Sequence, residues 1–286
     1  MAKYIGTYAT SGDVQTALNN QELSRPFIAY TTDNENVIFG PAAEKAEVGD
    51  IVVYSVADDL LHYIKQANYS ASTYPVADYV PVGVVAYPQN DDAILGPTGE
   101  ITFMGLNWLS ITSPDSGETT VQGLRWGYAN FDIPELTNYA NSGTAITDMN
   151  GKANTEAVLQ YATAQTDWRT ASAITFADAA GYYPVFECSW RYHTSGTVQG
   201  DWFVPACGQF GYIWNSDKLE KMNSGFTAIG ADIFRPAQAG SIFFTSTEYT
   251  AGAAYAWQRI SFGPRGLGKT TKNRVRPYCS KLMTRI

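Results

Sequence analysis

Short apolar runs rich in β-branched and aromatic residues constrain the fold of this chain most. The run Tyr79–Tyr87 (YVPVGVVAY) is the strongest, and Ile51–Val56 and Ile101–Leu106 have the same character. Each run is bounded by Gly, Pro, Asn or Asp, as β-strands and their turns usually are. We therefore expect residues 46–110 to form a small all-β domain, either a barrel or a sandwich.

Residues 1–45 offer only a few short elements. A strand is expected over Lys3–Tyr8, a short helix over Asp13–Leu18, and a hairpin with strands at Pro26–Tyr30 and Val37–Phe39. These elements predict a small α/β unit with a weak hydrophobic core, because so short a segment buries little apolar surface. We therefore expect residues 1–45 to anchor the chain to other proteins or to join copies of it.

The remaining residues, 111–286, mix helical and strand patterns. Apolar residues at helical spacing predict a helix over Thr155–Ala164, and Ala171–Ala180 is a second candidate. Strand patterns occur in three later segments, Ser241–Glu248, Tyr255–Phe262 and Asn273–Tyr278. The whole sequence therefore predicts an α+β, β-rich fold in three parts, with boundaries near residues 45 and 110.

The charge distribution limits the partners that the chain can have. Its formal net charge is −8, which argues against a nucleic-acid-binding face. The segment from Arg259 to Ile286 is an exception, because it holds eight basic residues and no acidic one. Two interpretations remain open for this segment: strand residues that pair with acids elsewhere in the chain, or a site for a polyanion.

The sequence shows neither a membrane-spanning stretch nor the features of a signal peptide. It contains no stretch of about 18 apolar residues, so we expect no insertion into a membrane. The N-terminal segment MAKYIGTYATSGDVQ lacks the apolar core and cleavage site of a signal peptide. Synthesis in a cytoplasm is therefore expected.

The few cysteines and histidines predict neither a metal site nor a cofactor. The three cysteines, Cys188, Cys207 and Cys279, form no CxxC pair and are too few for a disulfide framework. The two histidines, His62 and His193, have no partner at metal-ligand spacing. We expect the cysteines to be buried, unreactive thiols.

Residues Gly263–Thr270 (GPRGLGKT) match the P-loop pattern GxxxxGK[ST]. In a P-loop, Lys269 would reach the phosphates and Thr270 would bind Mg²⁺. A P-loop must open a helix, however, and Pro277 would stop a helix within about two turns. Only 16 residues follow Thr270, too few for the rest of a nucleotide-binding sheet. We therefore expect no nucleotide hydrolysis.

Three ordered stretches carry a resemblance to a known family. They are Asp148–Thr155 (DMNGKANT), Gly200–Ala206 (GDWFVPA), and a composite of Phe243–Tyr249 (FFTSTEY), Ala256-Trp257 and Asn273–Pro277 (NRVRP). They resemble the NGxxNT, GDWYLPS and YWSSTEY…AW…NRVRP motifs of C-type-lectin-fold proteins. Formylglycine-generating enzymes and the variable proteins of diversity-generating retroelements share that fold. The resemblance implies a C-type-lectin-like domain within residues 111–286.

The resemblance also implies a ligand-binding surface. In the diversified relatives, the variable positions lie around the AW strand and before the NRVRP segment. The corresponding positions here are Thr250, Ala251, Tyr255, Trp257, Gln258, Arg259, Ser261, Pro264, Arg265 and Leu267. For Trp257 a buried core position is the competing interpretation. The sequence departs from the most diversified relatives at Gly263–Gly268, where they have an Asn-rich run, so diversification itself stays open.

The overall layout is similar to that of virion proteins from crAss-like and other gut Bacteroides phages. This similarity implies a head fibre or tail adhesin, made in the host cytoplasm and located in the virion. Its partners would be other virion proteins through residues 1–45 and a ligand on the host cell, and a homotrimer would strengthen weak contacts.

We expect binding rather than catalysis, and binding without calcium, because the Glu-Pro-Asn motif of calcium-dependent lectins is missing. Two alternatives remain open. The chain could be a structural decoration protein without a ligand. It could also be an enzyme of the formylglycine-generating type, although the Gly-Gly-Ser-Trp stretch of that enzyme is absent.

Overall fold

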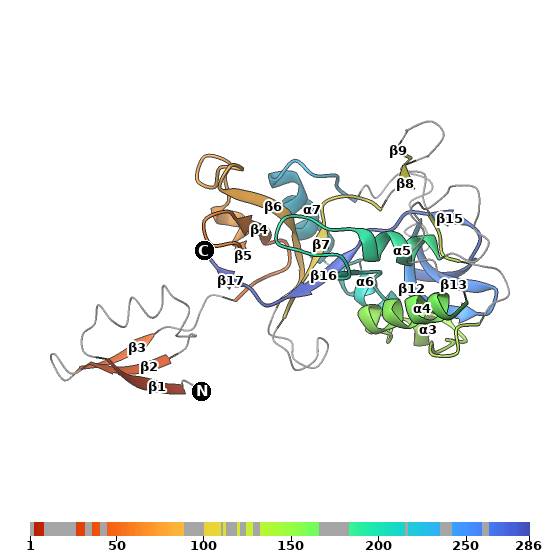
Figure 1. The fold of residues 1–286 in the computed structure, drawn as a ribbon, viewed down its shortest axis with the longest axis horizontal. Helices are drawn as coiled ribbons and strands as arrows, with labels where there is room; N and C mark the ends of the chain where they lie inside the picture. Colours follow the sequence, from red (N-terminus) through yellow and green to blue (C-terminus); the bar gives the residue numbers. More distant parts are fainter. Residues whose placement is uncertain are drawn as a thin grey trace. The chain divides into compact units, whose positions relative to one another are not determined.

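The computed structural model divides the chain into two compact units, Met1–Lys45 and Ala46–Ile286 (Figure 1). The structure describes residues 3–8, 27–31, 36–40, 45–88, 100–109, 111–112, 119–120, 124–127, 132–165, 183–214, 217–234, 242–258 and 263–286. The helices expected over Asp13–Leu18 and Ala171–Ala180 lie outside the described residues.

The first unit contains a three-stranded sheet in the order β1-β2-β3. Its strands are β1 (Lys3–Tyr8), β2 (Phe27–Thr31) and β3 (Asn36–Gly40). Strand β2 pairs with β1 in parallel and with β3 in antiparallel orientation. The three strands expected from the sequence are therefore present, and β2 is the central strand.

A seven-stranded sheet organises the second unit. Its strands are, in spatial order, β11 (Trp202–Phe203), β16 (Tyr278–Lys281), β7 (Ile101–Gly105), β6 (Tyr79–Tyr87), β4 (Ile51–Ser55), β5 (Leu60–Ile64) and β17 (Thr284–Arg285). The parallel pair β17–β5 is the exception in a sheet that is otherwise antiparallel. The three strongest apolar runs of the sequence occupy the centre, because β-branched residues fit a sheet that is covered on both faces.

This sheet overturns the expected boundary near residue 110. Strands β4 to β7 come from the part expected to be a separate all-β domain, but β11, β16 and β17 come from the C-terminal part. The cores merge as well, since Val48 and Val84 pack in one cluster with Phe210, Trp257 and Tyr278. Residues 46–110 therefore form neither a closed barrel nor a sandwich of their own, but one half of a shared sheet.

Smaller sheets complete the second unit. The three-stranded sheet β12-β13-β14 consists of β12 (Ile242–Thr250), β13 (Ala253–Gln258) and β14 (Gly263–Gly268). Two-residue strands form two further pairs, β8 (Ile111–Thr112) with β9 (Thr119–Thr120) and β10 (Leu124–Arg125) with β15 (Lys272–Asn273). The strand expected over Asn273–Tyr278 is therefore wrong, because the chain leaves β15 before it joins β16.

Helices pack around these sheets. They are α3 (Ser142–Ala145), α4 (Gly151–Gln165), α5 (Pro184–Arg191), α6 (Cys207–Trp214), α7 (Lys218–Ala228) and the 3₁₀ turn η1 (Gln66–Asn68). Helix α4 contacts β12, α6 contacts both β12 and β13, and α7 contacts β6. The helix expected over Thr155–Ala164 is confirmed, and it begins earlier, at Gly151. The predicted fold class, a strand-rich α+β fold, is confirmed.

Aromatic side chains dominate the largest hydrophobic cluster. Phe210 of α6 lies 5.5 Å from Phe243 of β12, and Phe234 lies 5.2 Å from Trp108, measured between ring centroids. Such offset and edge-to-face pairs add about 0.5–1.5 kcal/mol each beyond the area that they bury. The many aromatic residues of the sequence are thus used largely inside the fold, where they join helix α6 to the sheet β12-β13-β14.

Candidate functional site

The sheet β12-β13-β14 carries the positions that the sequence marks as a ligand surface. Strand β13 lies in the middle and pairs with β12 on one side and β14 on the other, both antiparallel. Across β13 and β14, Trp257 faces Pro264, Tyr255 faces Gly266 and Ala254 faces Leu267. Nearly all the marked positions lie on β13 and β14 or at their ends. Strand β13 is the central strand and β14 lies at the edge, so the surroundings of the two strands differ.

The exposed members of the surface lie on β14 and at the end of β12. Thr250 and Arg265 are exposed, and Ala251, Pro264 and Leu267 are half-buried. Thr250 and Ala251 lead into the turn to β13, and Thr250 pairs with Ala253, which in turn pairs with Gly268 at the end of β14. We call these five residues, Thr250, Ala251, Pro264, Arg265 and Leu267, the display edge.

The prediction that Tyr255 and Trp257 belong to the ligand surface is wrong. Their side chains are 2% and 0% exposed, so neither can contact a ligand on the surface. The Tyr255 hydroxyl donates to the Tyr139 carbonyl at 3.0 Å. Trp257 packs against α6 where a Cβ on Gly211 would lie 2.8 Å from its ring. Burial follows from the central position of β13, whose two faces contact different hydrophobic clusters.

The other predicted positions are described only in part. Gln258 ends β13 and pairs with Ile242 and Gly263, but its side chain lies outside the described residues. Arg259 and Ser261 lie outside the described residues altogether.

A buried hydrogen-bond network joins the motif stretches to β12, which belongs to the same sheet as the display edge. The carboxylate of Asp148 accepts from the Thr247 hydroxyl at 2.7 Å, the Asn154 amide at 2.8 Å and the Asn150 backbone at 3.0 Å. The Thr247 hydroxyl also accepts from the Cys207 backbone N–H at 2.8 Å. The first stretch and strand β12 are thus joined by one carboxylate, and Thr247 extends the network to the start of α6.

Thr155 forms a second connection of the same kind. Its hydroxyl donates to the Gly151 carbonyl at 2.8 Å and accepts from the Val204 backbone N–H at 3.0 Å. Ser246 of β12 donates from its backbone to the Pro205 carbonyl at 2.8 Å. Buried polar groups that are satisfied in this way rigidify a fold, since leaving any of them unpaired costs about 1–3 kcal/mol. The motif residues therefore build the support of the display edge rather than the edge itself.

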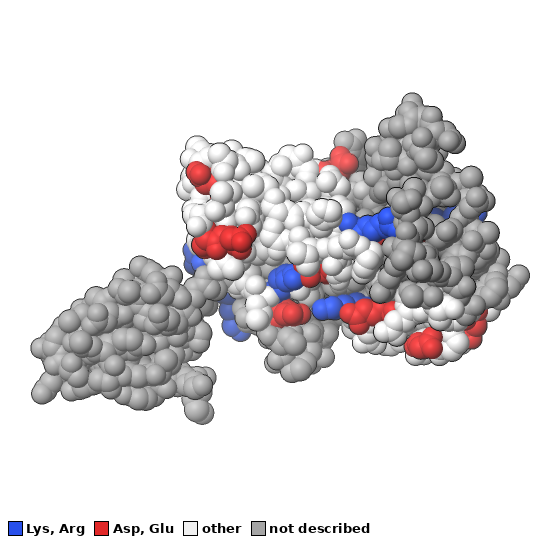
Figure 2. Space-filling model, viewed as in Figure 1, with Lys and Arg blue, Asp and Glu red and all other residues white. Residues whose placement is uncertain are grey.

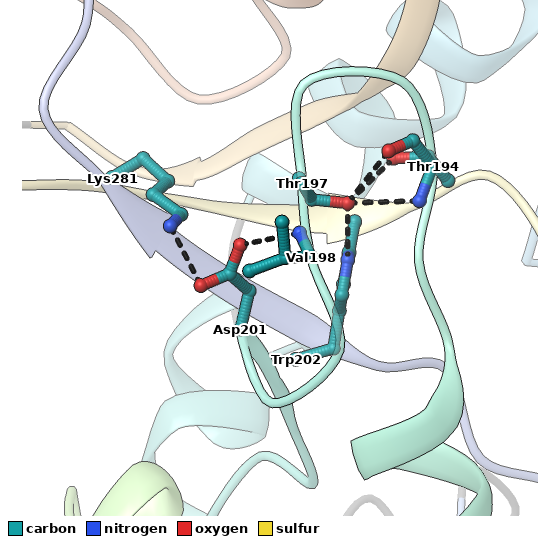
Figure 3. A network of polar contacts seen from close by, with 6 residues as sticks. All are labelled: Thr194, Thr197, Val198, Asp201, Trp202 and Lys281. Atoms are coloured by element: carbon teal, nitrogen blue, oxygen red, sulfur yellow. Dashed lines mark hydrogen bonds and ion pairs between the residues drawn. The ribbon is translucent and has the colours of Figure 1, made fainter.

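Polar contacts also fix the loop that contains the GDWFVPA stretch (Figure 3). The Trp202 indole N–H donates to the Thr197 hydroxyl at 3.0 Å, and Lys281 of β16 pairs with Asp201 at 2.6 Å. The second carboxylate oxygen of Asp201 accepts from the Val198 backbone at 2.8 Å. Gly200 adopts a φ of 95°, a left-handed conformation that favours glycine.

The lysine of the P-loop-like stretch has a structural role. Lys269 is fully buried and forms an ion pair with Glu248, which is also fully buried. Gly263–Gly268 is a strand, and a turn follows it, so the stretch does not open a helix. The geometry needed to bind phosphates at a helix N-terminus is therefore missing.

Other basic residues of the C-terminal segment are also engaged within the fold. The guanidinium of Arg276 is buried, donates to the carbonyls of Leu106 and Asp232, and lies 3.9 Å from the Phe226 ring centroid. Burial lowers the pKa of Arg276 to about 9. On the face shown in Figure 2, acidic and basic side chains of the described residues are interspersed. These contacts favour pairing within the fold over a polyanion site.

The three thiols are buried in three separate places. Cys207, Cys188 and Cys279 each belong to a different hydrophobic cluster, and all three are free. Burial raises the pKa of each thiol well above its usual range, which disfavours the reactive thiolate. Within the part of the chain that the structure describes, no group of His, Cys, Asp and Glu could hold a metal ion. No helix among the described residues is long and apolar enough to cross a membrane.

Comparisons with known proteins place the fold only broadly. No protein-family model and no curated protein matches the chain. A solved structure described as a fimbrial protein from Bacteroides ovatus matches with a TM-score of 0.50 and 13% identity. The match covers 88% of this chain and 52% of that one, so the chain spans about half the length of this neighbour. At this identity the match shows similarity of fold alone.

Proposed function

We propose that this chain is a surface-displayed binding protein without catalytic activity. The observation that carries the proposal is the contrast between a support fixed by the motif residues and exposed residues in the same sheet. The hydrogen bonds of Asp148 join β12 to α4, Thr155 joins α4 to Val204, and Thr250 and Arg265 remain exposed. A fixed scaffold with exposed edge residues suits recognition, because little conformational freedom is lost on binding.

The buried thiols support binding over the enzymatic alternative. A thiol-dependent oxidase needs a reactive thiolate that is open to substrate, whereas Cys188, Cys207 and Cys279 are enclosed in separate clusters. An oxidase activity that is lost when Cys207 and Cys279 are replaced by Ser would contradict the proposal.

In the finer form of the proposal, the chain is a phage virion protein, a head fibre or tail adhesin with a C-type-lectin-like domain. The three motif stretches and the overall layout of the sequence support this form. Residues 1–45 would anchor it to other virion proteins, the chain would form a homotrimer, and the display edge would contact a ligand on the host cell without calcium.

A fimbrial subunit is the second candidate, and the solved neighbour described as a fimbrial protein favours it. Both candidates place the chain on a surface that meets other cells, but they differ in the particle. Antibody labelling of purified virions and of purified fimbriae, viewed by electron microscopy, distinguishes them. Label on virions supports the finer form, whereas label confined to fimbriae replaces it with the second candidate.

The binding proposal itself is tested with the purified chain. A fluorescently labelled chain is expected to bind host cells saturably, equally with and without EDTA. Light scattering is expected to show an oligomer. Absence of binding to every host strain that the particle infects would support a purely structural decoration protein instead.

A further inference from the structure

The buried pair of Glu248 and Lys269 is a feature that the display edge does not use. Glu248 lies on β12 and Lys269 directly follows β14. Their side chains touch through Oε1 and Nζ, and both are 0% exposed. The Lys269 backbone N–H donates to the Gly252 carbonyl at 3.1 Å, and the Glu248 carbonyl accepts from the Tyr139 N–H at 3.2 Å. The main chain on both sides therefore holds the amine against the carboxyl group.

The surroundings give the charged forms of this pair little support. The ring of Trp126, which is fully buried, has its centroid 4.6 Å from the Lys269 Nζ. The second carboxylate oxygen of Glu248 accepts from the Ile133 backbone N–H at 3.4 Å, longer than the usual range of about 2.7–3.2 Å. Two charges removed from water need further strong hydrogen bonds to offset the loss of hydration. Burial here therefore acts against the charges.

The uncharged forms of the two groups are the reactive ones. Burial raises the pKa of the Glu248 carboxyl group and lowers the pKa of the Lys269 amine. Transfer of one proton from Nζ to the carboxylate gives an uncharged amine beside an uncharged carboxylic acid. An uncharged amine is a nucleophile, and a desolvated lysine reaches this form more easily than an exposed one. The site therefore favours attack of the amine on the acid.

A second buried pair of the same residue classes shows what is particular to this one. The Lys65 Nζ lies 3.1 Å from the Asp50 carboxylate, and the two side chains are 9% and 4% exposed. The Asp50 carboxylate also accepts from the backbone N–H of Glu47 at 2.7 Å and of Gln66 at 3.0 Å. Such hydrogen bonds stabilise a carboxylate in its charged form. Glu248 differs because its one further hydrogen bond that the structure describes is long.

We propose that Glu248 and Lys269 condense in the folded chain to form an amide cross-link between their side chains. The Lys269 Nζ attacks the Glu248 Cδ, a C–N bond forms, and the bond from Cδ to one carboxyl oxygen breaks. That oxygen leaves as water with two of the three protons of the ammonium group, so no oxidant or other reactant is consumed. Glu248 helps to line a cavity of about 200 Å³, which is large enough to receive the water.

The cross-link encloses the display edge. Glu248 and Lys269 are 21 residues apart in the sequence, and all five residues of the display edge lie between them. The bond joins β12 to the residue after β14 across the central strand β13. A covalent bond that closes a loop restricts the unfolded chain and so stabilises the folded sheet. The cross-link holds the sheet whether or not the display edge binds a ligand, so this inference does not rest on the proposed function.

Mass spectrometry of the intact, purified full chain tests the cross-link directly. After the folded chain has been incubated at neutral pH, its mass is expected to be about 18 Da, one water, below the mass calculated from the sequence. Proteolysis and fragmentation are expected to place this loss in one pair of peptides, joined through Glu248 and Lys269.

Matched variants locate the bond. Lys269→Arg keeps a cation opposite Glu248, but a guanidinium group stays protonated and is not a nucleophile. This variant is expected to have its full calculated mass and a melting temperature lower by roughly 6–12 °C, as loss of a loop-closing bond predicts. Glu248→Ala is also expected to have its full calculated mass. Lys281→Arg, the same change in the more exposed pair with Asp201, is expected to keep the loss of mass.

Two outcomes overturn the proposal. The first is the full calculated mass in the unaltered, folded chain after incubation, and this result decides the matter even where a variant fails to fold. The second is a loss of water that persists in Glu248→Ala or that fragmentation places at other residues, because the bond then does not join this pair.

Discussion

Strands β13 and β14 are neighbours in one sheet, yet they have opposite roles. In β13, Tyr255 and Trp257 are buried in the cluster that contains α6, and Ala254 and Ala256, which alternate with them, belong to a second hydrophobic cluster. In β14, Arg265 is exposed, and Pro264 and Leu267 are half-buried. The sequence marks both strands as one ligand surface, but among its described side chains those on β14 and at the end of β12 are the accessible ones. Position within the sheet therefore decides which of these side chains are buried in the core and which stay accessible.

The largest expected effect comes from the buried strand. Trp257→Ala removes a fully buried indole and is expected to lower the free energy of unfolding by about 3–5 kcal/mol. Pro264→Ala, at the paired position on β14, is expected to change it by no more than about 0.5 kcal/mol. Urea denaturation followed by tryptophan fluorescence measures both, and similar losses in the two variants would erase the contrast between the strands.

The buried ion pair at the end of β14 is expected to rank next. Lys269→Met leaves the Glu248 carboxylate buried without its cation and is expected to cost about 3 kcal/mol. Lys281→Met breaks a more exposed pair with Asp201 and is expected to cost about 1 kcal/mol or less.

The loss in Lys269→Met is also expected to depend on pH. Burial raises the pKa of Glu248 in the folded state above its value in the unfolded chain. Below the unfolded value the carboxyl is protonated in both states and the loss is smallest. As the pH rises through the folded value, the unfolded chain is favoured and the loss grows. Denaturation at about pH 4 and pH 8 measures this, and an equal loss at both would show that Glu248 is not the cause.

A smaller effect is expected in the network that supports the edge. Thr155→Val keeps the shape of the side chain but leaves the Val204 backbone N–H without its acceptor, at a cost of about 1–3 kcal/mol. Thr227→Val, on the exposed side of α7, is the control and is expected to change the free energy of unfolding by less than about 0.5 kcal/mol. Equal losses in thermal denaturation would mean that the network does not stabilise the fold.

The strands β4, β6 and β7 follow from the sequence because their apolar runs are short, β-branched and bounded by turn residues. Tyr79–Tyr87 becomes β6 over its whole length, and Thr155–Ala164 lies within α4. The joining of two sequence regions into one sheet could not be predicted in this way. Strand β16 pairs with β7 across more than 170 residues of chain; Thr102 and Ser280, for example, are 178 residues apart and hydrogen-bonded. Local sequence patterns contain no information about such long-range pairing.

The candidate site was predictable only in part. The motif stretches that carry the family resemblance meet in the structure, but as a support held by Asp148 and Thr155. Burial of Tyr255 could have been anticipated from the small residues beside it, since alternating Ala and aromatic residues suit a strand covered on both faces.

The central claim is that the display edge binds a ligand on another cell while the rest of the sheet only supports it. The most direct measurement compares the binding of two labelled triple variants to host cells. Thr250→Ala/Arg265→Ala/Leu267→Ala is expected to lose most of the binding, at least about tenfold, as truncation of several contact residues usually does. Lys152→Ala/Glu156→Ala/Gln160→Ala, on the exposed side of α4, is expected to bind like the unaltered chain. Equal binding by the two variants would contradict the account.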